Sequence, residues 1–367
     1  MFKAEELFQN ITDKNHPDET VLTIIQGKGT LPREQAGRNI HYDDASLSNY
    51  KKVEQGDFII HLRSFEGGLE MANEAGIVSP AYTILRCKRP HSSLFYDAYF
   101  HTDEFINHNL SKSVEGIRDG RQISYEAFKW LGIPYCEPTE QEKISNLFAA
   151  LNERIAKQRD LIEALKKYKR GLLMHYFSDD KTQLWTQCSI SQIGKVITGS
   201  TPPTNDRSNY DGDLLFCAPG DVGEQKYISS TEKRVSPKGF ALGRPLPPNS
   251  VIVTCIGLIG KLGIAKTSMI TNQQINALVV SESFDHEFIY YAFENFFPEY
   301  RSKVSMQTLP ILSKSEFEKL MIKVPDLDVQ HKISSHLAAM DRRIEHTQQE
   351  LNALIEHRRG IMQQLFI

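Results

Sequence analysis

One stretch of this chain occurs twice. Residues 141–161 read QEKISNLFAALNERIAKQRDL, and residues 330–350 read QHKISSHLAAMDRRIEHTQQE. With the offset of 189 residues held constant, 17 of the 54 positions from 124 to 177 match those from 313 to 366 without a gap, where chance gives roughly three. The repeat indicates a duplication, so the structure that it encodes is present twice.

Both copies carry apolar residues in alternating steps of four and three, the 3.5-residue seam of a coiled coil. The seam positions are Ile144, Phe148, Leu151, Ile155, Gln158, Ile162, Leu165, Lys169, Leu172 and Tyr176 in the first copy, and Ile333, Leu337, Met340, Ile344, Thr347, Leu351, Leu354, Arg358, Ile361 and Leu365 in the second. Polar residues interrupt each seam at the same two places. Such a helix extends about 55 Å, too long for the interior of an ordinary domain, so we expect a strut.

A single helix with this seam is equally compatible with a zipper between molecules. Two copies in one chain favour pairing with each other, because partners within a chain are at high effective concentration. In an antiparallel pair, Gln158 and Thr347 near the middle of the seams could face one another and determine the register, as buried polar residues do in coiled coils.

The material between the struts predicts two globules of mixed α/β structure. Runs rich in Val, Ile, Phe and Tyr, bounded by Gly, Pro, Asp and Ser, predict strands at 57–62, 81–85, 214–219 and 250–257. The two globules do not align over most of their length. Even so, each opens on a similar phrase, ELFQNIT or QIGKVIT, and each ends on a short amphipathic helix, at 124–131 or at 313–320.

These patterns predict an α+β protein with four segments. We expect a first globule over residues 1–133, a central repeated helix over 134–181, a second globule over 182–325 and a C-terminal repeated helix over 326–367. A duplicated scaffold that holds unlike globules suggests two related tasks with different targets.

Composition excludes several classes of protein. The 43 basic and 46 acidic side chains give a net charge of −3, so the chain is no general binder of nucleic acid and any DNA-binding face must be local. The start MFKAEELFQN lacks the basic and apolar pattern of a secretory signal, and we expect a cytoplasmic protein. Five widely spaced cysteines without a C-x-x-C pair encode neither a disulfide framework nor a zinc site.

No catalytic motif is present. GLIGKLG at 257–263 follows an apolar run but fits neither phosphate-loop pattern, so it predicts a tight turn that carries Lys261. TPPT at 201–204 lacks the Asn or Asp and the aromatic ring of an amino-methyltransferase loop, which leaves a proline-stiffened turn. The histidines form no metal motif and no G-x-S-x-G occurs, so we expect no catalytic residue and no metal site in this chain.

The order of these features resembles the specificity subunit of type I restriction-modification systems, over the whole chain. The second globule carries GSTPPTNDRSNYDGDLLFCAPGDV (199–222), CIGLIGKLGIA (255–265) and TNQQINAL (271–278). The first carries LSNYKKVEQGDFIIHLRSFEGG (47–68) and GIVSPAYTIL (76–85), which look like the matching segments of another recognition-domain subtype. Each motif is weak alone, but their order, doubled and followed each time by a strut, is fairly specific.

The resemblance implies a non-catalytic subunit in which each globule recognises one half of a bipartite DNA site. Antiparallel struts with pseudo-twofold symmetry would determine the gap between the halves. Two adenine methyltransferase subunits would dock on the scaffold, and restriction and translocase subunits would join them. S-adenosylmethionine, ATP and Mg would belong to those partners, and this chain would need no cofactor. Two sites one helical turn apart, about 34 Å, do require a rigid spacer between two readers.

Candidate DNA-binding residues follow from chemistry, with Lys and Arg on phosphates and amides at base edges. The stretch 226–244 is the best candidate, since it holds five cations and a single acid, Glu232. The candidates are Lys226, Lys233, Arg234, Lys238, Arg244, Lys261, Asn272, Gln273 and Gln274 in the second globule, and Gln26, Lys28 and Arg63 in the first. Asn and Gln can bond an adenine edge in two places. Equally, these amides could cap strands, and the charged stretch could be a solvated loop.

In the scaffold, identical residues recur at equivalent positions. They are Arg154, Arg170 and Gly171 in the first copy, with Arg343, Arg359 and Gly360 in the second. Glycine inside a helix costs about 1 kcal/mol relative to alanine, so a repeated glycine suggests close helix approach or a helix end. The arginines are candidates for subunit docking, and ordinary packing of the struts is the alternative. A two-headed protein-protein adaptor that binds no nucleic acid is the competing function.

Overall fold

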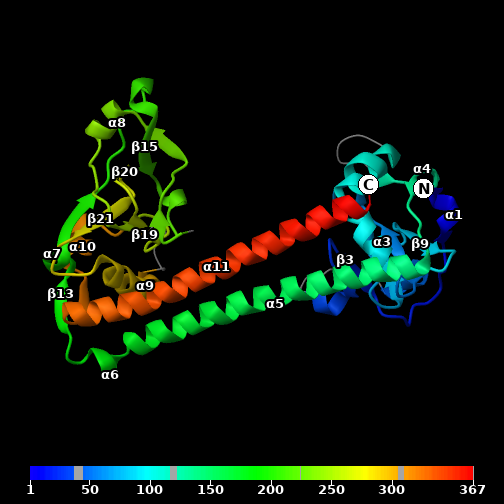
Figure 1. The fold of residues 1–367 in the computed structure, drawn as a ribbon, viewed down its shortest axis with the longest axis horizontal. Helices are drawn as coiled ribbons and strands as arrows, with labels where there is room; N and C mark the ends of the chain where they lie inside the picture. The colour runs from blue at the N-terminus through cyan, green and yellow to red at the C-terminus, as the bar shows by residue number, and fades with distance from the viewer. Residues whose placement is uncertain (37–43, 116–121, 224, 305–309, 367) are drawn as a thin grey trace. The chain divides into compact units, whose positions relative to one another are not determined.

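A computed structural model of the chain describes residues 1–36, 44–115, 122–223, 225–304 and 310–366. The chain forms two compact units, whose elements are labelled in Figure 1. The first unit comprises Met1–Asp160 and Gln348–Ile367, and the second comprises Leu161–Thr347. Each unit holds one globule together with a part of each long helix, whereas the boundaries expected from sequence separate globules from helices.

The two repeated segments are long helices, α5 (Pro138–Tyr176) and α11 (Leu327–Leu365), of 39 residues each. Their seams are confirmed, because seam residues such as Ile155, Ile162 and Leu351 are buried on otherwise exposed helices. The expected last seam position is wrong: Leu365 is exposed, and the neighbouring Met362 and Phe366 are buried instead. At the end of α11 these two side chains turn into the core of the first globule.

Within each unit the long helices run antiparallel to each other. In the first unit, Phe148 near the start of α5 stacks on Phe366, which follows the end of α11. In the second unit, Leu173 near the end of α5 shares a core with Ile333 near the start of α11. The expected contact between Gln158 and Thr347 joins residues of different units and stays a prediction. Gln158 donates to Glu350 Oε2 at 2.8 Å within the first unit.

Small strands and short helices build the first globule. Its strands are β1 (Phe2–Lys3), β2 (Phe8–Ile11), β3 (Leu22–Ile25), β4 (Gly29–Pro32), β5 (Lys51–Val53), β6 (Phe58–Ile60), β7 (Glu70–Met71), β8 (Gly76–Val78), β9 (Thr83–Cys87), β10 (Val114–Glu115), β11 (Gln122–Ile123) and β12 (Gly132–Ile133). Its helices are α1 (Ala4–Leu7), α2 (Ser64–Gly67), α3 (Ser93–Phe100) and α4 (Tyr125–Phe128). The largest sheet has the order β2-β9-β6-β7, and β3 and β4 form a separate hairpin.

The second globule has longer strands and two larger sheets. Its strands are β13 (Thr186–Ser189), β14 (Gly194–Thr198), β15 (Tyr210–Cys217), β16 (Tyr227–Ile228), β17 (Lys233–Val235), β18 (Val251–Thr254), β19 (Leu262–Ala265), β20 (Met269–Thr271), β21 (Ile275–Val280) and β22 (Met321–Val324). Its helices are α6 (Asp179–Thr182), α7 (Ile190–Ile193), α8 (Pro237–Leu242), α9 (His286–Val304) and α10 (Lys314–Lys319). The sheets have the orders β14-β21-β18-β19-β16 and β17-β15-β20.

The two globules share a skeleton, as the opening phrases and closing helices predict. A short helix, α1 or α7, leads into the first long strand of each globule, β2 or β14. The strand before that helix pairs antiparallel with the last strand of the globule, β1 with β12 and β13 with β22. Ser124 and Ser313 cap the closing helices α4 and α10 through their side chains, which accept a hydrogen bond from a backbone N–H.

Equivalent glutamines anchor both long helices to their globules. Gln141 accepts a hydrogen bond from the backbone N–H of Ser92 at 2.9 Å and donates to the carbonyl of Cys136 at 2.8 Å. Gln330 accepts from the backbone N–H of Asp285 at 2.9 Å and donates to the carbonyl of Pro325 at 2.8 Å. Both glutamines are almost fully buried. The duplication therefore includes the joint between helix and globule, not only the helix.

The long helices also contribute to the globular cores. In the first unit, Phe95 and Tyr99 of α3 each contact Phe366. In the second unit, Leu173 and Leu337 pack with the buried aromatic side chains of α9. Because these contacts are apolar and buried, each globule and the helix segments beside it form one hydrophobic unit.

Candidate nucleic-acid interface

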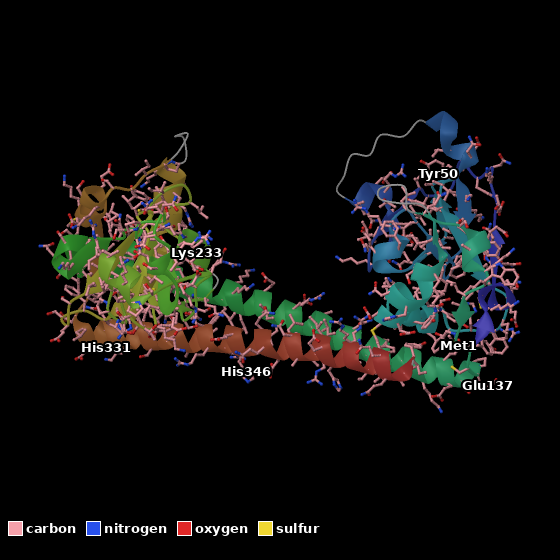
Figure 2. The ribbon with its side chains drawn as sticks, turned by 90° about the horizontal axis from the view of Figure 1, so that it is seen from above. Met1, Tyr50, Glu137, Lys233, His331 and His346 are labelled. Atoms are coloured by element: carbon pink, nitrogen blue, oxygen red, sulfur yellow. The ribbon has the colours of Figure 1, made fainter. Side chains whose placement is uncertain are left out.

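Lys233 and Arg234 form the most open cationic site of the second globule. Both lie on β17, an edge strand next to β15, and Lys233 is labelled in Figure 2. Val235 on the same strand is buried, and the two cations are exposed. Neither side chain has a hydrogen bond or ion pair with another residue of the described ranges. Their charges therefore remain available to an external phosphate.

The expectation for Lys226 is corrected. Its side chain is only 12% exposed, and its ammonium lies 2.7 Å from Glu287 Oε1 and 2.9 Å from the hydroxyl of Tyr291. The same ammonium lies over the Tyr291 ring, 4.5 Å from the centroid. A buried lysine held by a carboxylate and an aromatic ring stabilises the globule and is not free to bind DNA.

Lys238 and Arg244 are exposed but have partners inside the globule. The Lys238 ammonium lies 2.7 Å from Asp206 Oδ2, and this contact lowers the pKa of Asp206 to about 2. Arg244 donates to the carbonyl of Thr198 at 2.9 Å. Each side chain thus tethers the loop around 198–208. Each retains donors that an incoming phosphate could use.

Lys261 lies in a tight turn, as its glycine-rich surroundings predict. The turn joins β18 to β19, and Gly257 and Gly260 take positive φ angles there. Thr254 closes it, because its hydroxyl accepts from the backbone N–H of Lys261 at 3.0 Å. The Lys261 side chain is half-buried, and it has no hydrogen bond or ion pair among the residues that the structure describes.

The three amides after β20 divide into two roles. Asn272 and Gln274 bond to each other, since Asn272 accepts from the backbone N–H of Gln274 and donates to its side-chain oxygen. This is the capping role that the sequence left open. Gln273 is exposed, and its Oε1 accepts from the hydroxyl of Thr201 at 2.7 Å. The amide nitrogen of Gln273 thus remains for an outside acceptor.

Thr201 is a candidate that the sequence analysis missed. It opens the TPPT segment, which is a turn as expected: the carbonyl of Pro202 accepts from Tyr210 and that of Pro203 accepts from Asn209. These bonds fix the turn beside Gln273. The two prolines signalled its stiffness, but nothing in the sequence signalled its neighbour 72 residues away.

In the first globule the structure brings two of the three candidates into one place. Gln26 and Lys28 are exposed on the turn between β3 and β4, the QGKG segment. Gln26 also packs on Gly67 in α2, since a side chain built at Gly67 would meet its amide nitrogen at 2.0 Å. Arg63 directly precedes α2 and is exposed. Lys28 and Arg63 have no ion pair within the described residues.

The scaffold arginines at 154, 170, 343 and 359 are all exposed and form no ion pair within the described residues. The expectation for the glycines is corrected. Gly171 and Gly360 lie within the helices, and a Cβ atom built at either one meets no other atom within 4 Å. Neither glycine therefore marks close helix approach or a helix end.

The second polar position of each seam, Lys169 or Arg358, has different surroundings in the two units. Lys169 of α5 contacts Glu294 Oε2 at 2.9 Å and Asp341 Oδ1 at 2.7 Å in the second unit. Its equivalent, Arg358 of α11, lines a cavity of about 370 Å³ in the first unit, together with His101, Asp103 and Met362. Sequence periodicity marks both positions as exceptional but does not show their partners.

The described residues contain no group of three or more His, Cys, Asp or Glu side chains that could hold a metal ion. All five cysteines are free thiols, and burial raises the pKa of Cys217 to about 12. None of the helices within the described ranges has the length and apolar character to cross a membrane.

Comparison with known families adds the decisive observation. Residues 183–357 match the model of the type I restriction modification DNA specificity domain. The match extends from β13 through the second globule into α11, and it confirms the resemblance drawn from the sequence.

Two proteins with sequence similarity to this chain are named as specificity subunits. The chain is 30% identical over 178 residues to the specificity subunit of the type I restriction enzyme MjaIX from Methanocaldococcus jannaschii, covering 47% of this chain and 41% of that protein. It is 29% identical over 108 residues to the specificity subunit of the HindI enzyme from Haemophilus influenzae, covering 29% of this chain and 24% of that protein. The matches thus span less than half of each relative.

Solved structures extend the likeness in fold to the whole chain. The HsdS subunit from Thermoanaerobacter tengcongensis aligns with 100% of this chain and 95% of its own, with a TM-score of 0.53 and 17% identity. The S subunit of a type I system from M. genitalium aligns with the same shares, with a TM-score of 0.60 and 14% identity. At these identities the likeness shows the fold alone. The predicted α+β fold with its long paired helices is thereby confirmed.

Proposed function

We propose that the chain is the DNA sequence-recognition subunit of a type I restriction-modification complex. The observation that carries this proposal is the specificity-domain match over 183–357. The equivalent joints at Gln141 and Gln330, which hold two unlike globules on one duplicated scaffold, support it.

Each globule recognises one half of a bipartite DNA site. In the second globule, Lys233 and Arg234 bind phosphates, and Gln273 with Thr201 contacts bases. In the first globule, Lys28 and Arg63 bind phosphates and Gln26 contacts bases. Because phosphate contacts supply affinity and base contacts supply specificity, globules with different exposed amides recognise different sequences.

The long helices determine the gap between the half-sites. A helix of 39 residues is about 58 Å long, which exceeds the ~34 Å of one DNA helical turn. Packing of each helix into the core of a globule makes the spacer stiff at both ends. The contact geometry of the helices then fixes the number of base pairs between the half-sites.

Two methyltransferase subunits dock on the scaffold, one for each copy of the repeat. The exposed residues of α5 include Leu147 and Arg154 in the first unit and Leu161 and Tyr168 in the second, and the residues of each pair lie seven apart, in a stripe on one helix face. An exposed apolar stripe of this kind suits a partner helix. Arg170, Arg343 and Arg359 provide further exposed contacts.

The remaining chemistry belongs to the partners, and the complex works in the cytoplasm. S-adenosylmethionine binds to the methyltransferase subunits, whereas ATP and Mg bind to the restriction and translocase subunits. This chain selects the DNA sequence and contributes no catalytic residue.

Co-expression with a type I methyltransferase subunit tests the proposal. Adenine methylation is mapped across the genome of a host that lacks other methyltransferases, with and without this chain. A two-part motif with a fixed gap, seen only when both subunits are present, is expected. Methylation without such a motif, or none beyond that of the methyltransferase alone, would contradict the proposal.

A globule exchange provides the matched control. Replacing residues 1–133 by the first globule of another specificity subunit should change one half of the motif. The other half and the gap should stay the same. A change in both halves would show that the globules do not recognise DNA independently.

A further inference from the structure

The turn between β3 and β4 is held from below by a buried carboxylate. Glu70 on β7 is fully buried, and its two oxygens accept hydrogen bonds from the backbone N–H groups of Gly27 at 2.6 Å and Gly29 at 2.9 Å. Bonds from neutral donors to a carboxylate are among the stronger hydrogen bonds in proteins. The Glu70 side chain thus fixes the backbone N–H groups of the two residues on either side of Lys28.

Asn73 fixes the carbonyls of the same turn. Its amide nitrogen donates to the carbonyl of Lys28 at 2.8 Å and to that of Thr30 at 2.9 Å. Its own backbone N–H donates to the hydroxyl of Thr30 at 3.0 Å. Glu70 and Asn73 lie three residues apart, and together we name them the turn clamp. The clamp bonds both backbone N–H groups and backbone carbonyls of the turn, which fixes the turn relative to β7.

Close packing confirms how little room the turn has. A Cβ atom built at Gly29 would lie 2.5 Å from the carbonyl oxygen of Met71, and the φ angle of Gly29 is +77°. On the other side Gln26 fills the space above Gly67. The backbone that carries Gln26 and Lys28 is therefore closely packed at Gly29, whereas Gly27 has open space around it.

His101 neutralises the buried carboxylate of the clamp. Its Nδ1 lies 2.8 Å from the carbonyl of Asp97, so Nδ1 carries a proton, and its Nε2 lies 3.4 Å from Glu70 Oε1. An Nε2 that faces a carboxylate is stable only as the protonated donor. The other charged or titratable neighbours of His101 include the Asp97 carboxylate on α3 and His61 after β6, and the cavity that His101 lines is also lined by Glu66, Asp103, Arg358 and Arg359. Because His61 accepts from the backbone N–H of Arg63 through Nδ1, it is neutral.

We propose that Glu70 and Asn73, supported by His101, are positioning residues for recognition of the first half-site. They contact no DNA, but they hold Gln26 in the orientation that meets the bases and Lys28 in the orientation that meets a phosphate. This inference rests on the proposed function. It explains why a carboxylate is buried beneath a surface turn. Burying such a group costs stability, and a defined geometry of the turn is the functional gain that offsets this cost.

Glu70→Gln tests the clamp in the complex of the full chain with its methyltransferase. The amide keeps the size of the side chain, but its nitrogen meets the N–H of Gly29 as a second donor. Glu66→Gln is the matched control, because Glu66 is an exposed acid on the adjacent α2. Methylation rates are measured on three DNAs: the cognate site, one with a substitution in the first half, and one with a substitution in the second half.

The clamp predicts a change confined to one half of the site. Glu70→Gln should raise KM for cognate DNA and lower discrimination at the first half by about tenfold, since one base contact accounts for a factor of this size. The kcat and the discrimination at the second half should not change, and Glu66→Gln should match the wild type. Unaltered first-half discrimination, or an equal loss at both halves, would overturn the inference.

Asn73→Ala guards against misfolding, since it removes the bonds to two carbonyls without leaving a buried charge. It should lower first-half discrimination in the same direction while thermal unfolding remains a single cooperative transition. The wild type on the same three DNAs separates this inference from the proposed function. A wild-type complex that discriminates at neither half overturns both. A wild type that discriminates while both variants behave like it overturns the clamp alone.

Discussion

Lys169 and Arg358 occupy equivalent positions in the duplicated helices but meet different surroundings. The Lys169 ammonium lies between the carboxylates of Glu294 and Asp341. Burial lowers its pKa, but the two carboxylates outweigh burial and the pKa is raised. Burial lowers the pKa of Arg358, and its Nε atom is buried without a hydrogen bond among the described residues. Two carboxylates thus pair with the charge of Lys169, whereas Arg358 has no ion pair among the described residues.

This difference predicts unequal costs of removing each charge. Lys169→Met removes the cation between the half-buried carboxylates of Glu294 and Asp341 and should lower the free energy of unfolding by about 2 kcal/mol. Arg358→Met, the matched control, should cost less than about 1 kcal/mol. Urea unfolding measures both losses, with Trp130→Phe as the background for Lys169→Met. In that background, Trp185, which packs on Phe288 in the second unit, is the fluorescent reporter. Equal losses in the free energy of unfolding would contradict the different surroundings assigned to Lys169 and Arg358.

His101 and Glu70 predict a dependence of stability on pH. For Glu70, burial raises the pKa, but the bonds from His101, Gly27 and Gly29 outweigh it and the pKa is lowered. For His101, burial lowers the pKa, but Glu70 and Asp97 outweigh it and the pKa is raised. The Glu70 contribution is therefore lost as pH falls below 4.5, and the His101 contribution is lost as pH rises above 6.5.

The pair should stabilise the first unit most between these two values. Denaturant unfolding at about pH 5.5 and about pH 8.5 should show the greater stability at the lower pH. In His101→Gln this difference should shrink, because the neutral amide does not titrate. The same pH difference in wild type and variant would show that other groups produce it.

At the scale of the element, each long helix contains one glycine whose position is open to solvent. Gly171 and Gly360 are five residues from the last residue of their helices. No atom beyond the helix lies within 4 Å of a Cβ built there. Packing within this chain therefore does not explain why glycine occurs at both places.

Gly171→Ala and Gly360→Ala should each raise the free energy of unfolding by up to about 1 kcal/mol, because alanine is the better helix former. Denaturant titration of the isolated chain measures this gain. Co-purification with the methyltransferase subunit measures whether the glycines serve docking instead. A variant that destabilises the isolated chain would contradict the open environment seen here.

At the scale of the whole molecule, the proposal makes DNA affinity depend on salt. The logarithm of the affinity should fall linearly with the logarithm of the salt concentration, since cations on phosphates release counterions. The double variant Lys233→Ala/Arg234→Ala should reduce the magnitude of this slope by about two. Lys226→Met should leave the slope unchanged, because Lys226 is engaged by Glu287. Equal slopes for the wild type and the double variant would show that Lys233 and Arg234 do not bind the phosphates.

The sequence predicts the architecture well because periodicity is a local signal. Seam residues such as Ile155 and Leu351 are buried as the spacing requires, and the glycines around Lys261 mark a real turn. Long-range contacts leave no local signal. Lys226 is grouped with Lys233 by proximity in sequence, but Glu287, its partner 61 residues further on, removes it from the surface. Glu70 lies in no motif, so its role is visible only once the β3–β4 turn is placed above it.

The joints at Gln141 and Gln330 bear on how such a protein can diversify. Among the described residues, each glutamine side chain bonds only to main-chain groups, an N–H of Ser92 or Asp285 and a carbonyl of Cys136 or Pro325. Main-chain groups are present whatever the side chain, so this connector accepts Ser at one end and Asp at the other. A globule with a different side chain at this position can therefore keep the same glutamine joint to its helix.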